Sequence, residues 1–282
     1  MREKIKITLK IIFLLAIIST IAMYWYDQYI YYFPNEYASD SLAQCQEGSN
    51  VAVINIHGDI VTYLTEPSYP EEGLDPTISN SVSSEEIVAY IDEIEKNSNI
   101  KAVIVEIDSY GGYPVASEEI MNAIKKMTKP TIAVIREGAV SGAYLIASGA
   151  DRIYASEMSD VGGIGITMSY LDYSQQNKEE GIIYQQLSSG KFKDTGNPDK
   201  ELTAEEKELF MRDIKILHEA FVKRVAENRG LDIEKVEQLA DGSTMLGTAA
   251  KEKGLIDEIG NMSDAQEWIK ETLRIEPEIC VY

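Results

Sequence analysis

The sequence predicts an α/β fold with a helical C-terminal part, preceded by one N-terminal transmembrane helix. Three observations support this prediction. Short apolar, β-branched runs alternate with amphipathic segments from residue 51 onward. Helical patterns predominate from residue 203 onward, and the chain opens with a basic stretch followed by an uncharged apolar run. Strands separated by helices at this spacing indicate βαβ units with right-handed crossovers.

The N-terminus has the pattern of a membrane segment. Residues 1–10 carry four basic side chains against one acidic one, and residues 11–26 carry no charge. Counted from Ile7, about 20 residues at ~1.5 Å each span the ~30 Å core of a bilayer, because Lys10 can extend its amine to the interface. Basic residues before the span predict that the N-terminus stays in the cytoplasm.

We therefore expect a single-pass protein of the cell membrane. It would have a cytoplasmic N-terminus at 1–10, a transmembrane signal anchor at 11–28, a polar linker at 29–50 and an extracytoplasmic domain at 51–282. The alternative is a cleaved signal peptide, which needs small residues after the apolar run. Met23-Tyr24-Trp25-Tyr26 is a poor cleavage site, and these aromatic rings suit the headgroup region.

The composition excludes several kinds of site. With 47 acidic and 26 basic residues the net charge is −21, and no basic cluster lies beyond the first ten residues, so nucleic-acid binding is not expected. The two cysteines, Cys45 and Cys280, lack the spacing of zinc or thioredoxin motifs. A disulfide between them and two free thiols both remain open. We expect no metal and no cofactor.

Each expected element has its own signal. The runs VAVINI, KAVIVEID and TIAVIRE are typical of buried strands. The segment SSEEIVAYIDEIEKN begins with a serine cap and keeps Ile87, Ile91 and Ile94 on one face, as an amphipathic helix does. The expected strands are 51–56, 101–108, 131–137, 152–156 and 164–167, and the expected helices are 83–97, 114–127, 141–149, 203–228, 233–239, 247–253 and 263–273.

Two strand-to-helix junctions could carry chemistry. The stretch from Asp108 to Pro114 contains a glycine pair, which permits a tight turn and leaves N–H groups that can hold an oxyanion. The second junction places Ser141 among small residues at the start of a buried helix, where negative charge is favoured. Alone, the first stretch is more typical of an ordinary strand-to-helix turn, and Ser141 of a helix N-cap.

A nucleophilic serine needs a base. The two histidines, His57 and His218, have no obvious aspartate partner in the local pattern, and we expect both to be structural. A lysine can serve as base if burial lowers its pKa from ~10.4 towards neutrality. Lys191 and Lys193 are the candidates, and spacing does not choose between them.

The motifs in combination resemble the signal peptide peptidase (SppA) family, a Ser-Lys group with a ClpP/crotonase-like fold of repeated ββα units. The resemblance covers residues 51 to about 260 and is of the single-domain type. The motifs that carry it are VAVI-x-x-x-G-x-I at Val51–Ile60, D-S-x-G-G at Asp108–Gly112, S-G-x-Y-x-x-A-x-x-A-D at Ser141–Asp151, G-x-I-G at Gly162–Gly165 and S-G-x-x-K-D at Ser189–Asp194.

The resemblance implies a membrane-anchored serine endopeptidase. Ser141 would be the nucleophile and Lys193 the general base, while Gly112 and the N–H of Ser141 or Gly142 would form the oxyanion hole. The implied reaction is acyl-enzyme hydrolysis of cleaved signal peptides and other unfolded apolar polypeptides. The resemblance also implies a homo-oligomeric ring whose site is built from neighbouring copies.

Two positions depart from the family pattern. Gly163 stands where the family has a serine whose hydroxyl helps to hold the lysine, so Ser159, Thr167 or water would have to substitute. Tyr110 replaces a proline in the glycine turn. The alternative is therefore a catalytically weak or inactive member that acts as a peptide-binding membrane scaffold. A crotonase-type acyl-CoA enzyme is a third reading, opposed by the anchor, the acidic balance and the presence of both dyad residues.

Overall fold

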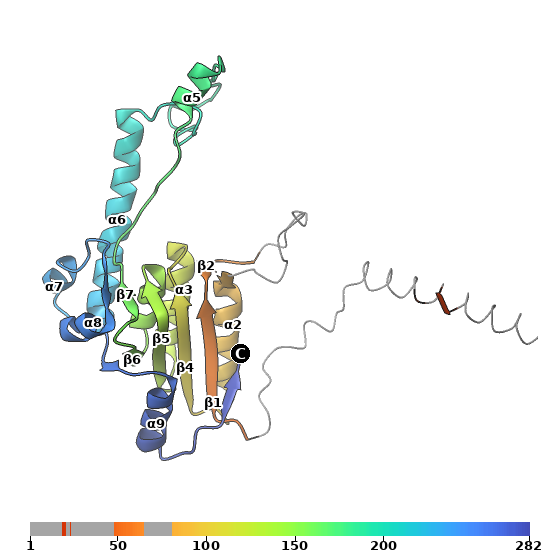
Figure 1. Ribbon diagram of the computed structural model, residues 1–282, viewed down its shortest axis with the longest axis vertical. Coiled ribbons are helices and arrows are strands. Elements are labelled where there is room, and N and C mark those ends of the chain that lie inside the picture. Colours follow the sequence, from red (N-terminus) through yellow and green to blue (C-terminus); the bar gives the residue numbers. More distant parts are fainter. Residues whose placement is uncertain (1–18, 21–22, 24–47, 65–80) are drawn as a thin grey trace, which may run out of the picture. The chain divides into compact units, whose positions relative to one another are not determined.

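The computed structural model describes residues 19–20, 23, 48–64 and 81–282 of the chain (Figure 1). The predicted cytoplasmic stretch, most of the transmembrane helix predicted at 11–28 and most of the predicted linker lie outside these residues. Among the residues described, no helix has the length and apolar character needed to cross a membrane. The fold presented here is that of the unit Cys45–Tyr282.

A parallel sheet forms the centre of this unit, in the order β10-β1-β4-β5-β6-β9. The predicted strands VAVINI, KAVIVEID and TIAVIRE are confirmed as its central members. They are apolar along nearly their whole length because a parallel sheet of this kind is covered on both faces. The strands are β1 (Val51–His57), β4 (Ala102–Ser109), β5 (Thr131–Val140), β6 (Arg152–Ala155), β9 (Glu258–Ile259) and β10 (Ile279–Val281).

Helices cover both faces of the sheet. On one face Ala52, Ile54 and Ile56 of β1 belong to the same buried cluster as residues of α2 (Ser84–Lys96), α3 (Pro114–Lys126) and α4 (Gly142–Ser148). On the other face the alternate residues Val51 and Val53 pack in a cluster with Ala265 and Ile269 of α9 (Met262–Leu273). The period of two along β1 thus separates the two halves of the core.

The strand predicted at 164–167 is wrong. The strand in this region is β7 (Asp160–Gly162), which pairs with the end of β5 and, antiparallel, with β8 (Thr244–Leu246). Gly162 and Gly163 have φ of 102° and 59°, so the chain leaves the extended conformation before the apolar residues that suggested a strand. No sequence signal indicated the small parallel pair β2 (Asp59–Val61) and β3 (Ser81–Ser83).

The last strand holds one of the two cysteines. Cys280 is buried in β10 and disulfide-bonded, and no described cysteine is free. Cys45 lies outside the described residues. Of the two possibilities left open by the sequence, the structure supports a disulfide.

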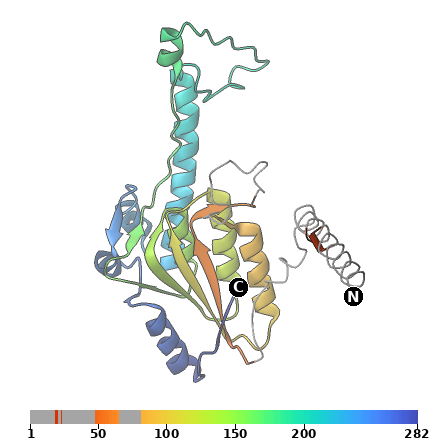
Figure 2. The same cartoon turned by 45° about the vertical axis from the view of Figure 1, so that its right-hand side comes forward.

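The long helix α6 (Ala204–Arg229) extends well beyond the sheet (Figure 2). Thr203 and Glu206 form a capping box at its start, and Gly230 ends it in the left-handed conformation. Its C-terminal half buries Phe221, Val222 and Val225 in the main core cluster. The remaining helices are α5 (Ser174–Glu179), α7 (Ile233–Glu237) and α8 (Gly247–Lys253).

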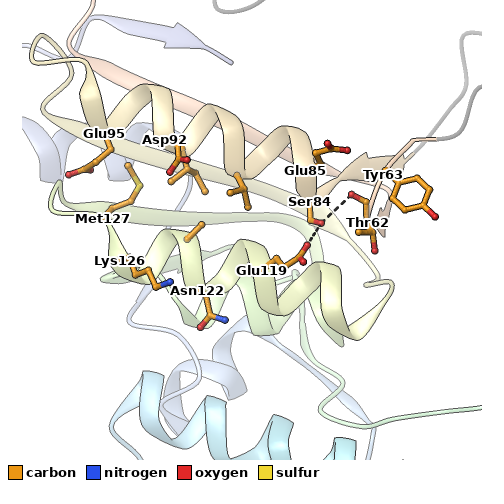
Figure 3. Close-up of a pocket in the computed structure, with 13 residues that line it drawn as sticks. Thr62, Tyr63, Ser84, Glu85, Asp92, Glu95, Glu119, Asn122, Lys126 and Met127 are labelled. Carbon is orange, nitrogen blue, oxygen red and sulfur yellow. Dashed lines mark hydrogen bonds between the residues drawn. The ribbon is translucent and has the colours of Figure 1, made fainter.

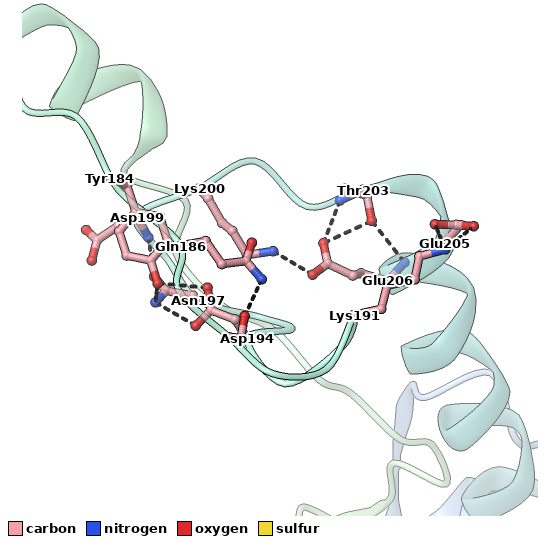
Figure 4. A network of polar contacts seen from close by, with 11 residues as sticks. Tyr184, Gln186, Lys191, Asp194, Asn197, Asp199, Lys200, Thr203, Glu205 and Glu206 are labelled. Carbon is pink, nitrogen blue, oxygen red and sulfur yellow. Dashed lines mark hydrogen bonds and ion pairs between the residues drawn. The ribbon is translucent and has the colours of Figure 1, made fainter.

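Residues 168–203, which we call the arm, connect the sheet to the start of α6 and contain α5 at the far end of that helix (Figures 1 and 2). Polar contacts fix the arm against the first turn of α6 (Figure 4). The Lys200 ammonium contacts Glu206 at 2.5 Å and Lys191 contacts Glu205 at 2.6 Å. Hydrogen bonds from Lys200 and Thr203 lower the pKa of Glu206 to about 2, so this carboxylate stays ionised at neutral pH.

Candidate active site

Ser141 lies at the turn between β5 and α4, as the sequence predicted. It is the N-cap of α4, with φ 55° and ψ −125°, and among the described residues only Arg274 is another non-glycine with positive φ. Such a conformation costs about 1–3 kcal/mol and persists only where the surroundings impose it. Here β5 is held on both sides by β4, β6 and β7, and every residue of α4 is buried. The serine side chain is thus presented at a rigid, strained corner.

Two backbone N–H groups lie beside Ser141. A Cβ placed on Gly111 would be 3.0 Å from both the Gly142 nitrogen and the Ser141 Cβ, and one placed on Gly142 would be 3.5 Å from the Gly112 nitrogen. The N–H of Ser141 itself donates to the Gly162 carbonyl at 2.8 Å. Within the described part of the chain the N–H groups of Gly112 and Gly142 have no acceptor, and they are therefore the pair available to an oxyanion.

Both positions require glycine. A Cβ on Gly112 would stand 2.0 Å from the carbonyl oxygen of Ile60, and a Cβ on Gly142 would stand 2.2 Å from Ser117 Oγ. Ser117 is fully buried in α3, where its hydroxyl donates to the Tyr113 carbonyl at 3.0 Å. The buried Ser109 hydroxyl donates to the Gly58 carbonyl at 2.6 Å and accepts from the N–H of the turn's first glycine at 3.1 Å.

No sequence motif alone predicts that Ser109 and Ser117 support the site. Ser109 is part of the D-S-x-G-G motif. Ser117 lies on the buried side of an amphipathic helix, and a polar residue at such a core position is the signal that the sequence offers for it.

An apolar cleft of about 120 Å³ opens on one side of Ser141. An ion pair of 2.8 Å between Arg224 of α6 and Glu118 of α3 also borders it. The apolar lining comes from α3, α4, α6 and the segment after β7, and comprises Pro114, Val115, Leu145, Ile166, Leu217, Ala220 and Phe221. A cleft of this size and lining suits one aliphatic side chain next to the serine.

A second hollow, of about 370 Å³, also has Ser141 in its lining and mixes apolar with polar residues; we call it the polar hollow, after the polar side chains named next. Its lining includes Gly163, Thr167, His218 of α6 and Asp241. The sequence predicts a structural role for His218 because no aspartate stands near it in the chain; in the structure Asp241 lines the same hollow, from the loop after α7. The other histidine, His57, lies 3.5 Å from Glu106 and lines neither hollow.

The structure does not bring Lys193 to Ser141 within one chain. Lys193 is exposed in the arm and lines neither hollow, and its ammonium has no hydrogen-bond or ion-pair partner among the described residues. Its neighbour Lys191 contacts Glu205 in the first turn of α6, while the apolar cleft begins at Leu217. At ~1.5 Å per residue these two points of the helix are about 18 Å apart.

The structure distinguishes the side chains proposed to substitute for a serine at Gly163. A Cβ on Gly163 would be 2.5 Å from Val140 Cγ1, and φ is 59°, so a side chain there is strained in this backbone. Ser159 is buried, donates to the Arg136 carbonyl and lines neither hollow. Thr167 lines the polar hollow, with its hydroxyl 2.9 Å from that of Ser169. Of Ser159 and Thr167, Thr167 is therefore the residue that lines the hollow and could substitute for the family's serine.

A larger hollow of about 780 Å³ lies apart from this site, between α2 and α3 (Figure 3). Several carboxylates line it, and Glu119 accepts a hydrogen bond of 2.6 Å from the buried Ser84 hydroxyl. Its lining contains no member of the Ser141 constellation.

Known proteins resemble this chain in sequence. The model of Peptidase family S49 matches residues 123–276, more than half of the chain and including Ser141 and Lys193. A Methanocaldococcus jannaschii protein provisionally named a protease is 35% identical over 68% of this chain and 63% of its own length. An Enterococcus faecium protein provisionally named signal peptide peptidase SppA is 29% identical over 87% of this chain and 70% of its own length.

One further sequence relative and one solved structure resemble this chain. The chloroplast serine protease SPPA of Arabidopsis thaliana is 30% identical over 67% of this chain but only 28% of its own length. Among solved structures, a ClpP1 mutant of Listeria monocytogenes superimposes with a TM-score of 0.49 and 16% identity, over 75% of this chain and 92% of that one. The family match and the sequence relatives show that the chain is a member of peptidase family S49 and of its SppA group.

Proposed function

We propose that the protein is a membrane-anchored serine endopeptidase that uses Ser141 as nucleophile and Lys193 as general base. The observation that carries this proposal is the strained turn at Ser141, with the N–H groups of Gly112 and Gly142 beside it. In the proposed reaction the Ser141 hydroxyl attacks a peptide carbonyl, whose oxygen becomes an oxyanion between these N–H groups. Lys193 takes the serine proton and passes it to the leaving amine, and water then releases the acyl group.

The base is proposed to come from a second copy of the chain. Lys193 is exposed within one chain, whereas a lysine acts as base only where burial disfavours its charged form. Docking of the arm on a neighbouring copy would supply that burial and would bring the ammonium to the polar hollow at Ser141.

Apolar side chains exposed on the arm support the same proposal. Exposed apolar patches of this kind commonly mark contact surfaces. Leu187 is 96% exposed, and the other apolar residues exposed in this segment are Met168, Tyr170, Leu171, Tyr173, Ile182, Ile183 and Phe192. Repetition of a head-to-tail contact between arm and hollow would generate a homo-oligomeric ring.

The proposed substrates are cleaved signal peptides and other unfolded apolar polypeptides. The apolar cleft next to Ser141 favours an aliphatic side chain beside the cleaved bond. The anchor at 11–28 would hold the domain beside the bilayer in which apolar peptides remain, with the peptidase unit on the extracytoplasmic side.

Lys193→Ala in the full chain is expected to lower kcat/KM for a synthetic signal peptide by about 100-fold or more, because removal of a general base commonly costs 10²–10⁴-fold. The matched control is Lys191→Ala, two residues away. Lys191 forms an exposed ion pair with Glu205, so its loss should leave kcat/KM within about threefold. Equal activity of both variants would contradict the assignment of the base, and a folded, assembled wild type without any hydrolysis would favour the scaffold alternative.

A further inference from the structure

The side chains that line the polar hollow beside Ser141 suit the binding of an ammonium group. Its lining includes His218, Thr167 and Asp241, together with Ser141. Gly163 contributes no side chain. An ammonium has three N–H donors and no acceptor, and each of these groups can accept a hydrogen bond when the imidazole is neutral.

Asp241 supplies a fixed negative charge. Its carboxylate accepts hydrogen bonds from the hydroxyl of Ser243 at 2.5 Å and from the backbone N–H of the same residue at 2.9 Å. The bonds from Ser243 lower the pKa of Asp241, so the group remains ionised at neutral pH. A hollow with a fixed anion attracts a cation and would reject an acidic side chain.

We propose that His218 is a positioning residue, which holds the Lys193 ammonium of a second copy against Ser141 while Asp241 provides the counter-charge. The inference rests on the proposed function, because it takes Lys193 as the base. A neutral imidazole suits this role because it accepts a hydrogen bond from the amine and so orients it. Thr167 supplies the second neutral acceptor.

Few charges surround His218. Asp241 is the one other ionisable group that lines the hollow within the described residues. On α6, Lys215 lies one turn before His218 and pairs with Glu219 at 3.8 Å. On β7, Asp160 accepts a bond of 3.4 Å from the Thr244 hydroxyl. The lining of the hollow thus holds one fixed charge, that of Asp241.

This arrangement predicts a particular order of activity among variants of the full-length enzyme. Glutamine accepts a hydrogen bond as a neutral imidazole does, so His218→Gln should keep kcat/KM within about tenfold of wild type. Because His218 acts only through Lys193, His218→Ala should cost no further activity in chains that already carry Lys193→Ala. His218→Ala, which offers no acceptor, should fall below the glutamine variant.

The matched control is His57→Ala, which removes the other histidine and should leave kcat/KM within about threefold of wild type. If His218→Ala were as active as wild type, or if it lowered kcat/KM equally with and without Lys193, the positioning role would be overturned while the Ser-Lys proposal stayed intact. Wild-type activity in Lys193→Ala, in contrast, would mean that the proposed function itself is wrong. Full activity of Lys193→Ala together with no activity of His218→Ala would mean that His218 is the base. That result would overturn both the positioning role and the proposed function.

Discussion

Replacement of Ser141 by alanine or by glycine is expected to lower peptide hydrolysis by at least about 10³-fold, because either variant lacks the attacking oxygen. The two variants should differ in stability. Ser141 has φ 55°, a conformation that costs a residue with a Cβ about 1–3 kcal/mol and costs glycine little. After allowance for the greater freedom of glycine in the unfolded chain, Ser141→Gly should exceed Ser141→Ala in free energy of unfolding by about 1 kcal/mol.

Chemical denaturation of both variants, measured beside peptide hydrolysis, checks this expectation. We expect the glycine variant to be inactive yet at least as stable as the wild type. Such a result would show that the substitution removes the backbone strain at residue 141 together with the activity. Activity retained in either variant would exclude Ser141 as nucleophile. A glycine variant less stable than the alanine variant would show that the backbone at this corner is not strained.

Gly112→Ala is expected to affect both the fold around the site and its chemistry. The added Cβ would stand 2.0 Å from the Ile60 carbonyl oxygen, and rotation of a side chain cannot relieve a collision between two backbones. Displacement of the turn would move one of the two N–H groups away from Ser141, and removal of an oxyanion donor commonly costs 10²–10³-fold. We expect kcat to fall by about 10³-fold and the free energy of unfolding by about 1–3 kcal/mol.

Gly138→Ala on β5 is the control for this variant. A Cβ at Gly138 would meet its nearest neighbour, the Asp160 carbonyl oxygen, at 3.5 Å, which is an ordinary contact. The same chemical change close to the same serine should therefore leave kcat within about threefold of wild type. If Gly112→Ala were as active as Gly138→Ala, the oxyanion hole would have to lie elsewhere.

Much of the fold could be predicted from the sequence because local signals and tertiary structure agree. The apolar β-branched runs became β1, β4 and β5, and the helix predicted at 83–97 became α2 with its serine cap intact. The errors arose where local signals are weak. The apolar residues at 164–167 suggested a strand, but two glycines with positive φ directed the chain out of the sheet, and β7 was too short to show a pattern.

The site could be predicted only in part, for a physical reason. Ser141 and the glycine pair lie at the ends of neighbouring parallel strands, so the strand order itself brings them together. His218 and Asp241 come from α6 and the loop after α7, and no sequence pattern shows where a long helix will dock. Lys193 was recognised from its motif, but its place in an exposed arm depends on how far α6 extends from the core, which local patterns do not encode.

Mixing Ser141→Ala chains with Lys193→Ala chains tests whether Lys193 of one copy acts on Ser141 of another. Each full-length variant is inactive alone if both residues are required. If one copy's arm completes the neighbour's site, random assembly at equal amounts places an intact serine opposite an intact lysine at about a quarter of the interfaces, and the mixture should recover about a quarter of wild-type hydrolysis. A mixture that assembles normally yet stays as inactive as its components would contradict the claim that Lys193 acts on the serine of a second copy.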